Sequence, residues 1–433
     1  MPSMRPVVIV TLLGLLCGPL PAVAGDGWSL EKVVVIERHG VRSPTKSPAE
    51  LARFASEPWP EWPVAPGILT PHGARALERM GAFLKARYAG RELIPATGCP
   101  APDSVFVWAD SGDQRTRESG RALLTGMFPG CGLSAHHRVA GTDDPLFDPW
   151  AGGYCRVDGE KARQAILARA DLDNLGPDYE RAHERLRQVL RPGTTGSATA
   201  DDRRQQIRSS GDEIRLTGPL ASDSSIAENL LLEYSEGFPM SKVGWGRLAA
   251  GDLADVMVLH NLYADLARKT PYIASHRGAP LAGQILDATG LRRGAATAEK
   301  PGNISVQPVQ VPVPDGARFI LFMGHDTNLS NVSGLLGLDW ALEGQPDHTA
   351  PGTALVFEIW RNPASGDRGV RALVFSQTLE QTRAAAVLGD ANPPASAELR
   401  IPGCASDGDG LCRLADFQRI VRDAVPADCL LLH

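Results

Sequence analysis

The stretch Val33-Val34-Val35-Ile36-Glu37-Arg38-His39-Gly40-Val41-Arg42 changes abruptly from an apolar run to a cluster of charged side chains. Two other runs end in the same way. Val105-Phe106-Val107-Trp108 leads to Ala109-Asp110, and Phe319-Ile320-Leu321-Phe322-Met323 leads to Gly324-His325-Asp326. Continuous β-branched and aromatic runs of this length are typical of strands that a parallel sheet buries on both faces. We therefore predict three such strands, each followed by polar residues.

Helical patterns follow the first two strands. Thr70-Pro71-His72-Gly73 precedes apolar residues at helical spacing up to Leu84, and a second helix is predicted over 116–127. Strands that alternate with helices indicate an α/β fold with a mostly parallel central sheet and flanking helices. Sites in such folds form at the carboxyl ends of the strands, where all three polar clusters lie.

The middle of the chain has a different pattern. Strand signals fade between Arg156 and Arg268, and helices are predicted over 160–175, 179–190, 225–236 and 251–268. The passage 192–212, rich in Gly, Ser, Thr and Asp, predicts a flexible surface loop. We therefore predict an inserted, smaller, all-helical cap domain over 156–268. The α/β catalytic domain then comprises 25–155 and 269–433.

The amino terminus is typical of an export signal. Arg5 precedes a mostly apolar run, and Ala22-Val23-Ala24 forms an A-x-A site before Gly25. This pattern predicts a signal peptide over 1–24, because the run is too short to span a membrane. We expect a periplasmic or secreted monomer that has no membrane contact once the signal is removed. With 44 basic and 50 acidic residues, the chain also lacks the charge expected of a nucleic-acid-binding protein.

Cysteine usage agrees with export. Cys17 lies within the predicted signal, and the other six cysteines form an even set suited to disulfides in an oxidising compartment. Six thiols allow 15 pairings, which the sequence leaves open. Buried free thiols are the alternative, and the absence of a C-x-x-C pair disfavours zinc.

The polar clusters suggest phosphate chemistry. Arg38 and Arg42 present guanidinium groups that match phosphate oxygens, and the imidazole of His39 between them can attack phosphorus. An aspartic acid such as Asp326 can protonate a leaving alkoxide. Taken singly, each residue has another interpretation, since arginines are often solvated. The His325-Asp326 pair also suits metal ligation or a helix cap.

Longer motifs carry a resemblance to a known family. Arg38-His39-Gly40-Val41-Arg42-Ser43-Pro44 resembles the R-H-G-x-R-x-P signature of the histidine acid phosphatases, and Gly324-His325-Asp326-Thr327-Asn328 resembles their distal motif. The stretches 144–147, 244–247 and 344–347 are similar to those of bacterial periplasmic phytases and glucose-1-phosphatases of this family. The resemblance runs from Val33 to the carboxyl end.

The resemblance implies an acid phosphomonoesterase that works through a phosphohistidine. His39 is then the nucleophile, Asp326 the proton donor, and Arg38, Arg42, Arg115 and His325 the phosphate ligands. No metal or other cofactor is required. Asp110 matches the family less well, because one extra residue separates it from Arg115. The implied disulfides are Cys99–Cys131, Cys155–Cys429 and Cys404–Cys412.

The expected partner is a small phosphomonoester, and its identity rests on the same resemblance. The positions that match phytate contacts are Thr45, Lys46, His260 and Arg277, which favours phytate (inositol hexakisphosphate). Glu228 can instead narrow the pocket, and the segment 236–240 resembles the glucose-1-phosphatases. A glucose-1-phosphatase or broader sugar-phosphate phosphatase is therefore the alternative. Two more distant alternatives are a member of the mutase branch, whose motif normally has no counterparts of Arg42 and Pro44, and a non-catalytic phosphate-binding module.

Overall fold

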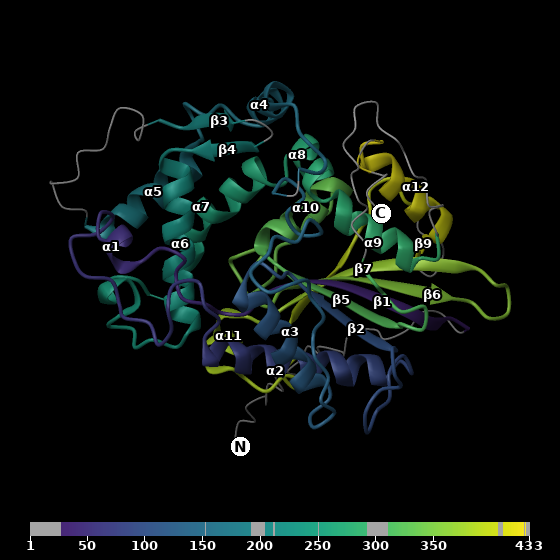
Figure 1. Ribbon diagram of the computed structural model, residues 1–433. Coiled ribbons are helices and arrows are strands. Elements are labelled where there is room, and N and C mark those ends of the chain that lie inside the picture. Colours follow the sequence, from purple (N-terminus) through teal and green to yellow (C-terminus); the bar gives the residue numbers. More distant parts are fainter. Residues whose placement is uncertain are drawn as a thin grey trace, which may run out of the picture.

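The computed structural model describes residues 27–151, 153–191, 204–210, 213–249, 251–291, 311–405, 410–427 and 429. The predicted signal peptide lies outside these ranges, as do residues 192–203 and 211–212 of the predicted loop. A sheet flanked by helices lies beside a second group of helices (Figure 1). Among the described helices, none combines the length and apolar character needed to cross a membrane.

A single large sheet forms the body. Its strands run in the order β2 (Val105–Ala109), β5 (Phe319–Gly324), β1 (Ser29–Arg38), β6 (Ala354–Arg361), β7 (Arg368–Ser376) and β8 (Ala395–Leu399), and β9 (Cys412–Arg413) pairs with β7. Strand β5 pairs in parallel with both β1 and β2, which confirms the three predicted strands and the α/β class. From β6 onward the strands are antiparallel. These additional strands were not among the predicted ones.

Successive side chains of β1 face two separate cores. Val34 and Ile36 pack in a cluster with residues of α8 (Pro271–Arg277), α9 (Ala279–Ala288), α10 (Asp326–Leu336) and α12 (Leu414–Ala424). Val33 and Val35 pack on the opposite face with α2 (Pro71–Ala89) and α3 (Gln114–Met127). Burial on both faces explains why these strands are apolar at every position.

The helices of the predicted cap pack around one hydrophobic cluster. Residues of α5 (Pro177–Leu190), α6 (Pro219–Ser235) and α7 (Asp252–Ala267) supply most of it, and Leu51 and Leu379 of the predicted catalytic domain join it. The shorter elements are α1 (Pro48–Leu51), α4 (Gly159–Leu167), the 3-10 helix η2 (Val243–Gly246) and α11 (Leu379–Ala384). Helix α4 ends at Leu167, earlier than predicted, and a separate turn follows, in which the Asp171 carboxylate accepts a hydrogen bond from the Asp173 amide at 3.0 Å.

The prediction of an all-helical cap is wrong in one respect. Strands β3 (Gln206–Ser210) and β4 (Glu213–Thr217) form an antiparallel hairpin, so part of the predicted loop is a strand. Ile207 lies opposite Leu216 in this hairpin, and both join the cap core. Burial of two apolar side chains therefore overrides the polar composition of the surrounding segment.

A close approach of backbones positions the loop that follows β1. The Thr70 side chain caps α2 by accepting a hydrogen bond from the Gly73 amide at 2.9 Å. A Cβ atom on Gly73 would lie 2.2 Å from the carbonyl oxygen of Val41. Only glycine therefore lets the first turn of α2 pack against the segment between His39 and Arg42.

Two of the three predicted disulfides are present. Cys99 pairs with Cys131, and Cys404 pairs with Cys412. The third predicted pair, Cys155 with Cys429, stays a prediction. Both of these side chains are buried in the same hydrophobic cluster.

Candidate active site

The first and last predicted motifs meet at the ends of two neighbouring strands. Arg38 at the end of β1 lies opposite Gly324 at the end of β5, and the His39 amide donates a hydrogen bond to the Gly324 carbonyl at 2.9 Å. The ring centroids of His39 and His325 are 5.5 Å apart. Parallel pairing therefore brings two segments together that lie at opposite ends of the sequence.

His39 is buried and has one ring nitrogen engaged. Its Nδ1 lies 2.8 Å from the Gly40 carbonyl oxygen, which fixes the proton on Nδ1 and leaves a lone pair on Nε2. Burial lowers the pKa of His39 well below its ordinary value, and the neighbouring charges, led by Arg115 and Arg38, lower it further. The neutral imidazole is the form that can act as a nucleophile.

Two arginines converge on one carboxylate. The guanidinium of Arg38, which is fully buried, donates to Asp347 at 3.1 Å and to the Thr349 carbonyl at 2.6 Å, and it also contacts Glu228. Arg42 donates to both oxygens of Glu228, at 3.1 and 3.0 Å. Burial would raise the pKa of Glu228, but the charges of Arg42 and Arg38 outweigh it and lower the pKa to about 2. Glu228 is therefore a buried anion between the predicted phosphate ligands.

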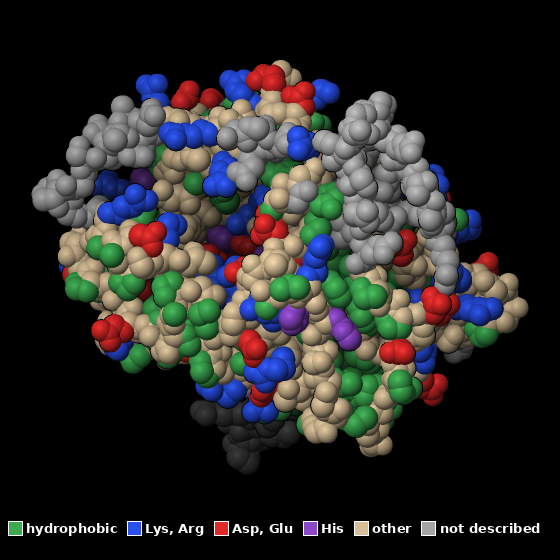
Figure 2. All heavy atoms as spheres, in the orientation of Figure 1, with side chains coloured by type: hydrophobic (Ala, Val, Ile, Leu, Met, Phe, Trp, Pro, Cys, Tyr) green, Lys and Arg blue, Asp and Glu red, His purple; other side chains and the backbone are tan. Residues whose placement is uncertain are grey.

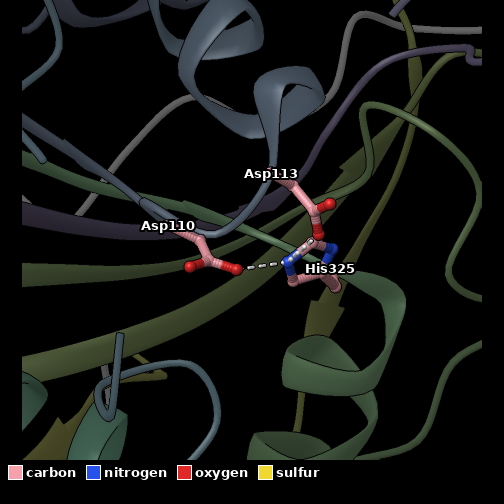
Figure 3. A group of neighbouring side chains, drawn as sticks. All are labelled: Asp110, Asp113 and His325. Atoms are coloured by element: carbon pink, nitrogen blue, oxygen red, sulfur yellow. Dashed lines mark hydrogen bonds and ion pairs between the residues drawn. The ribbon is translucent and has the colours of Figure 1, made fainter. Parts of the chain in front are cut away.

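A second set of carboxylates surrounds His325. Asp110, which follows β2, accepts a hydrogen bond from Nε2 of His325 at 2.6 Å, and Asp113 at the start of α3 lies 3.7 Å from the same nitrogen (Figure 3). Asp113 also pairs with Arg115 at 2.6 Å. Burial raises the pKa of Asp110, but the hydrogen bond from His325 and its charge outweigh this and lower it. The arrangement holds the imidazole of His325 in one orientation.

The same three side chains meet one geometric requirement of a metal site. Asp110, Asp113 and His325 each offer one ligand atom, and these atoms lie within 4.8 Å of one another. The hydrogen bond to His325 and the ion pair to Arg115 already occupy both carboxylates. These contacts account for the cluster without a metal ion.

Asp326, the first residue of α10, has both carboxylate oxygens engaged. Oδ1 accepts a hydrogen bond from the Thr327 amide at 2.8 Å, and Oδ2 accepts one from Arg268 at 2.5 Å. Nε2 of His260 lies 3.9 Å from Oδ2. Burial opposes ionisation, but Arg268, Arg38 and His260 together hold the pKa of Asp326 well below its ordinary value. In this state the carboxyl group is ionised.

The predicted substrate contacts lie around this centre. Lys46 donates to the Ser225 hydroxyl at 3.1 Å, on the same helix as Glu228. Arg277 pairs with Asp148 at 3.4 Å, and its guanidinium lies 4.2 Å from the ring centroid of Trp150. The surface is hollowed between the helices of the predicted cap and the body, with basic and acidic side chains around the hollow (Figure 2).

Thr45 lies beside Arg115 near the same backbone. A Cβ atom on Gly67 would lie 3.7 Å from a guanidinium nitrogen of Arg115 and 3.8 Å from the Thr45 methyl group. Thr45 and Arg115, one of the predicted phosphate ligands, therefore both lie close to Gly67. Strand β2 is not adjacent to β1 in the sheet. Arg115 still lies close enough to His39 to lower its pKa, because α3 begins immediately beyond the loop that follows β2.

Sequence reasoning missed several residues of the centre. Arg268, Asp347 and Asp113 all contact predicted site residues, but none of them belongs to a motif at a strand end. Arg268 follows the last turn of α7, and Asp347 lies in a loop. The stretch 344–347 was noted only as a family motif, so its role as a partner of Arg38 required the structure.

The fold and this centre define a class of protein. The chain matches the family model of the Histidine phosphatase superfamily (branch 2) over residues 29–375, and it belongs to that family. It is a phosphatase of the histidine acid phosphatase group.

The relatives of the chain are phosphatases of two kinds. It is 33% identical to Phytase AppA of Escherichia coli K12, over 97% of this chain and 99% of the relative. It is 28% identical to the glucose-1-phosphatase of Salmonella typhimurium, over 92% and 93% of the two chains. The structure of Hafnia alvei phytase in complex with myo-inositol hexakis sulphate superposes with a TM-score of 0.83 at 36% identity, over 93% of this chain and 99% of that one.

Proposed function

We propose that this enzyme is an exported acid phosphatase that hydrolyses phytate among other phosphate esters, with His39 as its nucleophile. One observation carries the proposal. Pairing of β1 with β5 brings His39 beside His325-Asp326, with the guanidinium groups of Arg38, Arg42 and Arg115 near it. A non-catalytic phosphate-binding module would need the arginines but would have no use for this histidine with a free Nε2.

In the first step, Nε2 of His39 attacks phosphorus as the bond to the ester oxygen breaks. The three arginines and His325 stabilise the charge on the equatorial oxygens of the transferring group, which is the main contribution that a protein makes to phosphoryl transfer. Because Arg38 is anchored by Asp347 and Thr349, its guanidinium is already oriented before the substrate arrives.

The second step hydrolyses the phosphohistidine. Asp326 protonates the departing alkoxide in the first step, and in the second its carboxylate accepts a proton from the attacking water. Water supplies the hydroxyl group, the bond between phosphorus and Nε2 breaks, and His39 returns to its neutral form. An acidic working pH follows from the need for a protonated Asp326.

Phytate is favoured by the cations around the centre. Lys46, Arg268 and Arg277 lie outside the trio of arginines, and each can bind a further phosphate of a polyphosphorylated ring. The similarity to the phytases of Escherichia coli and Hafnia alvei supports the same substrate.

Glucose 1-phosphate is the second candidate. The buried anion Glu228 repels additional phosphates, which favours an ester with one phosphate, and the glucose-1-phosphatase of Salmonella typhimurium is also similar. Comparing kcat/KM for phytate and glucose 1-phosphate decides between them. A strong preference for the sugar ester would reject the assignment as a phytase but would keep the assignment as a phosphatase.

The mechanism itself is tested with p-nitrophenyl phosphate. We expect the purified mature chain to release phosphate at acidic pH in the presence of a chelator and His39→Ala to abolish this activity. Trapping of acid-labile, base-stable radioactive phosphate on the wild-type chain, and not on the variant, would identify the phosphohistidine. Full turnover by His39→Ala would overturn the proposal.

The remaining proposals concern the organisation of the protein. Residues 156–268 form a cap domain on a catalytic domain of 25–155 and 269–433, and the chain is a periplasmic or secreted monomer after removal of 1–24. The hydrophobic cluster that α5, α6 and α7 share supports the division, although Leu51, Trp59 and Leu379 of the predicted catalytic domain also pack in it. Mass spectrometry of the exported protein tests the cleavage after residue 24. Light scattering tests whether the protein is a monomer.

A further inference from the structure

Arg268 holds the carboxylate that the mechanism needs as an acid. Its guanidinium donates to Oδ2 of Asp326 at 2.5 Å, and the other oxygen of Asp326 accepts from the Thr327 amide. A carboxyl group that protonates a leaving oxygen must carry its proton on one of these two atoms. The guanidinium, which is a cation with only donors, favours the ionised form of the carboxyl group and so opposes a proton on Oδ2.

The other groups that face Asp326 do not compensate for Arg268. The charged or titratable groups that act on it are Arg38 from β1, Arg115 from α3, Glu228 from α6, His260 from α7, and Arg268 itself. The nearby anions are Glu228, which pairs with Arg38 and Arg42, and Asp347, which pairs with Arg38 and lies 3.9 Å from the same Nε2 of His260, so cations already balance both of them. The unliganded centre therefore favours an ionised Asp326 that cannot act as an acid.

Arg268 is also placed to meet a substrate. Its side chain retains 18% of its exposed surface, and it lies at the end of α7 near Tyr263, whose ring centroid is 5.6 Å from the guanidinium carbon. The charge of Arg268 is close enough to lower the pKa of Arg277, after the larger effect of burial. The guanidinium groups of Arg268 and Arg277 are thus near neighbours, which suits a phosphate next to the one that is transferred.

We propose that Arg268 is a specificity-determining residue that exchanges Asp326 for a second phosphate of the bound substrate. This inference rests on the proposed function, because it takes Asp326 as the acid. When a neighbouring phosphate binds Arg268, Oδ2 of Asp326 takes up a proton from solvent. That proton passes to the ester oxygen as its bond to phosphorus breaks and the bond from phosphorus to His39 forms. When the substrate carries only one phosphate, the hydrogen bond from Arg268 to Asp326 stays in place.

The experiment compares Arg268→Gln with wild type on phytate and on glycerol 2-phosphate, which carries one phosphate and an alkyl leaving group. Loss of one charged hydrogen bond should lower kcat/KM for phytate about ten- to hundredfold. On glycerol 2-phosphate kcat should rise, and the alkaline limb of its pH profile should move to higher pH. Arg268→Lys, which keeps the charge, should retain part of the phytate activity.

Arg185→Gln is the matched control. It breaks an ion pair of 2.6 Å with Asp252 at the opposite end of α7, about 24 Å away along the helix. This variant should keep both wild-type pH profiles. If Arg268→Gln loses activity equally on both substrates and its pH profile is unchanged, Arg268 has a merely structural role and the inference is overturned. Wild-type activity of Arg268→Gln on both substrates would overturn it as well.

Failure of the phytate assignment is distinguishable from failure of this inference. If the wild-type enzyme hydrolyses glycerol 2-phosphate but not phytate, the substrate proposal falls. The inference then depends on two readouts: the shifted pH profile of Arg268→Gln on glycerol 2-phosphate, and weaker inhibition of that variant by myo-inositol hexakissulfate. Unchanged inhibition with an unchanged profile would reject it.

Discussion

The carboxylate of Asp110 accepts a hydrogen bond of 2.6 Å from Nε2 of His325, although 215 residues separate the two in sequence. The contact exists because β2 and β5 are neighbours and the polar residues that follow them lie at the same edge of the sheet. Asp110 thus contacts the imidazole that lies beside His39, a position from which it can hold the orientation of that ring.

Asp110→Asn tests this role. The amide keeps the shape but loses the charge that holds His325, so kcat should fall about ten- to hundredfold, the effect of losing a hydrogen bond to a charged group. The measurement is kcat for p-nitrophenyl phosphate, with circular dichroism to verify the fold. Wild-type kcat in a folded variant would show that the orientation of His325 is unimportant.

Glu228→Gln should strengthen binding of inorganic phosphate. Glu228 neutralises Arg38 and Arg42, and the amide can still accept a hydrogen bond without competing as an anion. The inhibition constant of phosphate should fall about tenfold, which corresponds to 1.4 kcal/mol. A higher inhibition constant would mean instead that Glu228 is needed to hold the two arginines in place.

Glu233 makes stability depend on pH. It is buried on α6, where Oε2 accepts a hydrogen bond from the Gly244 amide at 3.0 Å and Oε1 has no hydrogen-bond partner. Burial raises the pKa of Glu233 from 4.5 to about 8. Because the folded state binds this proton more tightly than the unfolded state, the stabilisation is complete below pH 4.5 and is lost as the pH rises towards about 8.

The corresponding test is urea unfolding of Glu233→Gln at pH 5 and pH 7. Between pH 5 and pH 7 the unfolded chain ionises Glu233 while the folded chain keeps it protonated, which should cost the wild type about 2 to 3 kcal/mol of stability, and the variant should lose much of this dependence. Glu184→Gln, on the exposed face of α5, is the control and should behave as wild type. Identical pH dependence in wild type and Glu233→Gln would contradict the assignment.

Gly73→Ala should lower both stability and activity. The new Cβ would lie 2.2 Å from the Val41 carbonyl, so either α2 or the loop that carries Arg42 must shift, and overpacking of this kind costs about 1–3 kcal/mol. Gly90→Ala at the other end of α2 is the control, since its Cβ would lie 3.4 Å from the nearest atom. Thermal unfolding and kcat measure both effects. Equal melting temperatures for the two variants would refute the steric argument.

Much of the fold was predictable because its signals are local. The apolar runs that became β1, β2 and β5 are buried on both faces, and their composition shows it without reference to the rest of the chain. The helices over 116–127 and 179–190 were predicted within two residues of α3 and α5 at their amino-terminal ends. The β3–β4 hairpin was missed because its stability comes from the cap core and its own sequence is mostly polar.

The candidate catalytic residues were recognisable from the sequence alone: a histidine and two arginines after one strand, and a histidine and an aspartate after another. Residue type and position at a strand end are local properties, so they can be recognised before folding is known. The charges that surround these residues became visible once the chain was folded. Glu228 between Arg38 and Arg42, and Arg268 on Asp326, arise from helices packed over the strand ends, and contacts between distant segments leave no periodic pattern in the chain.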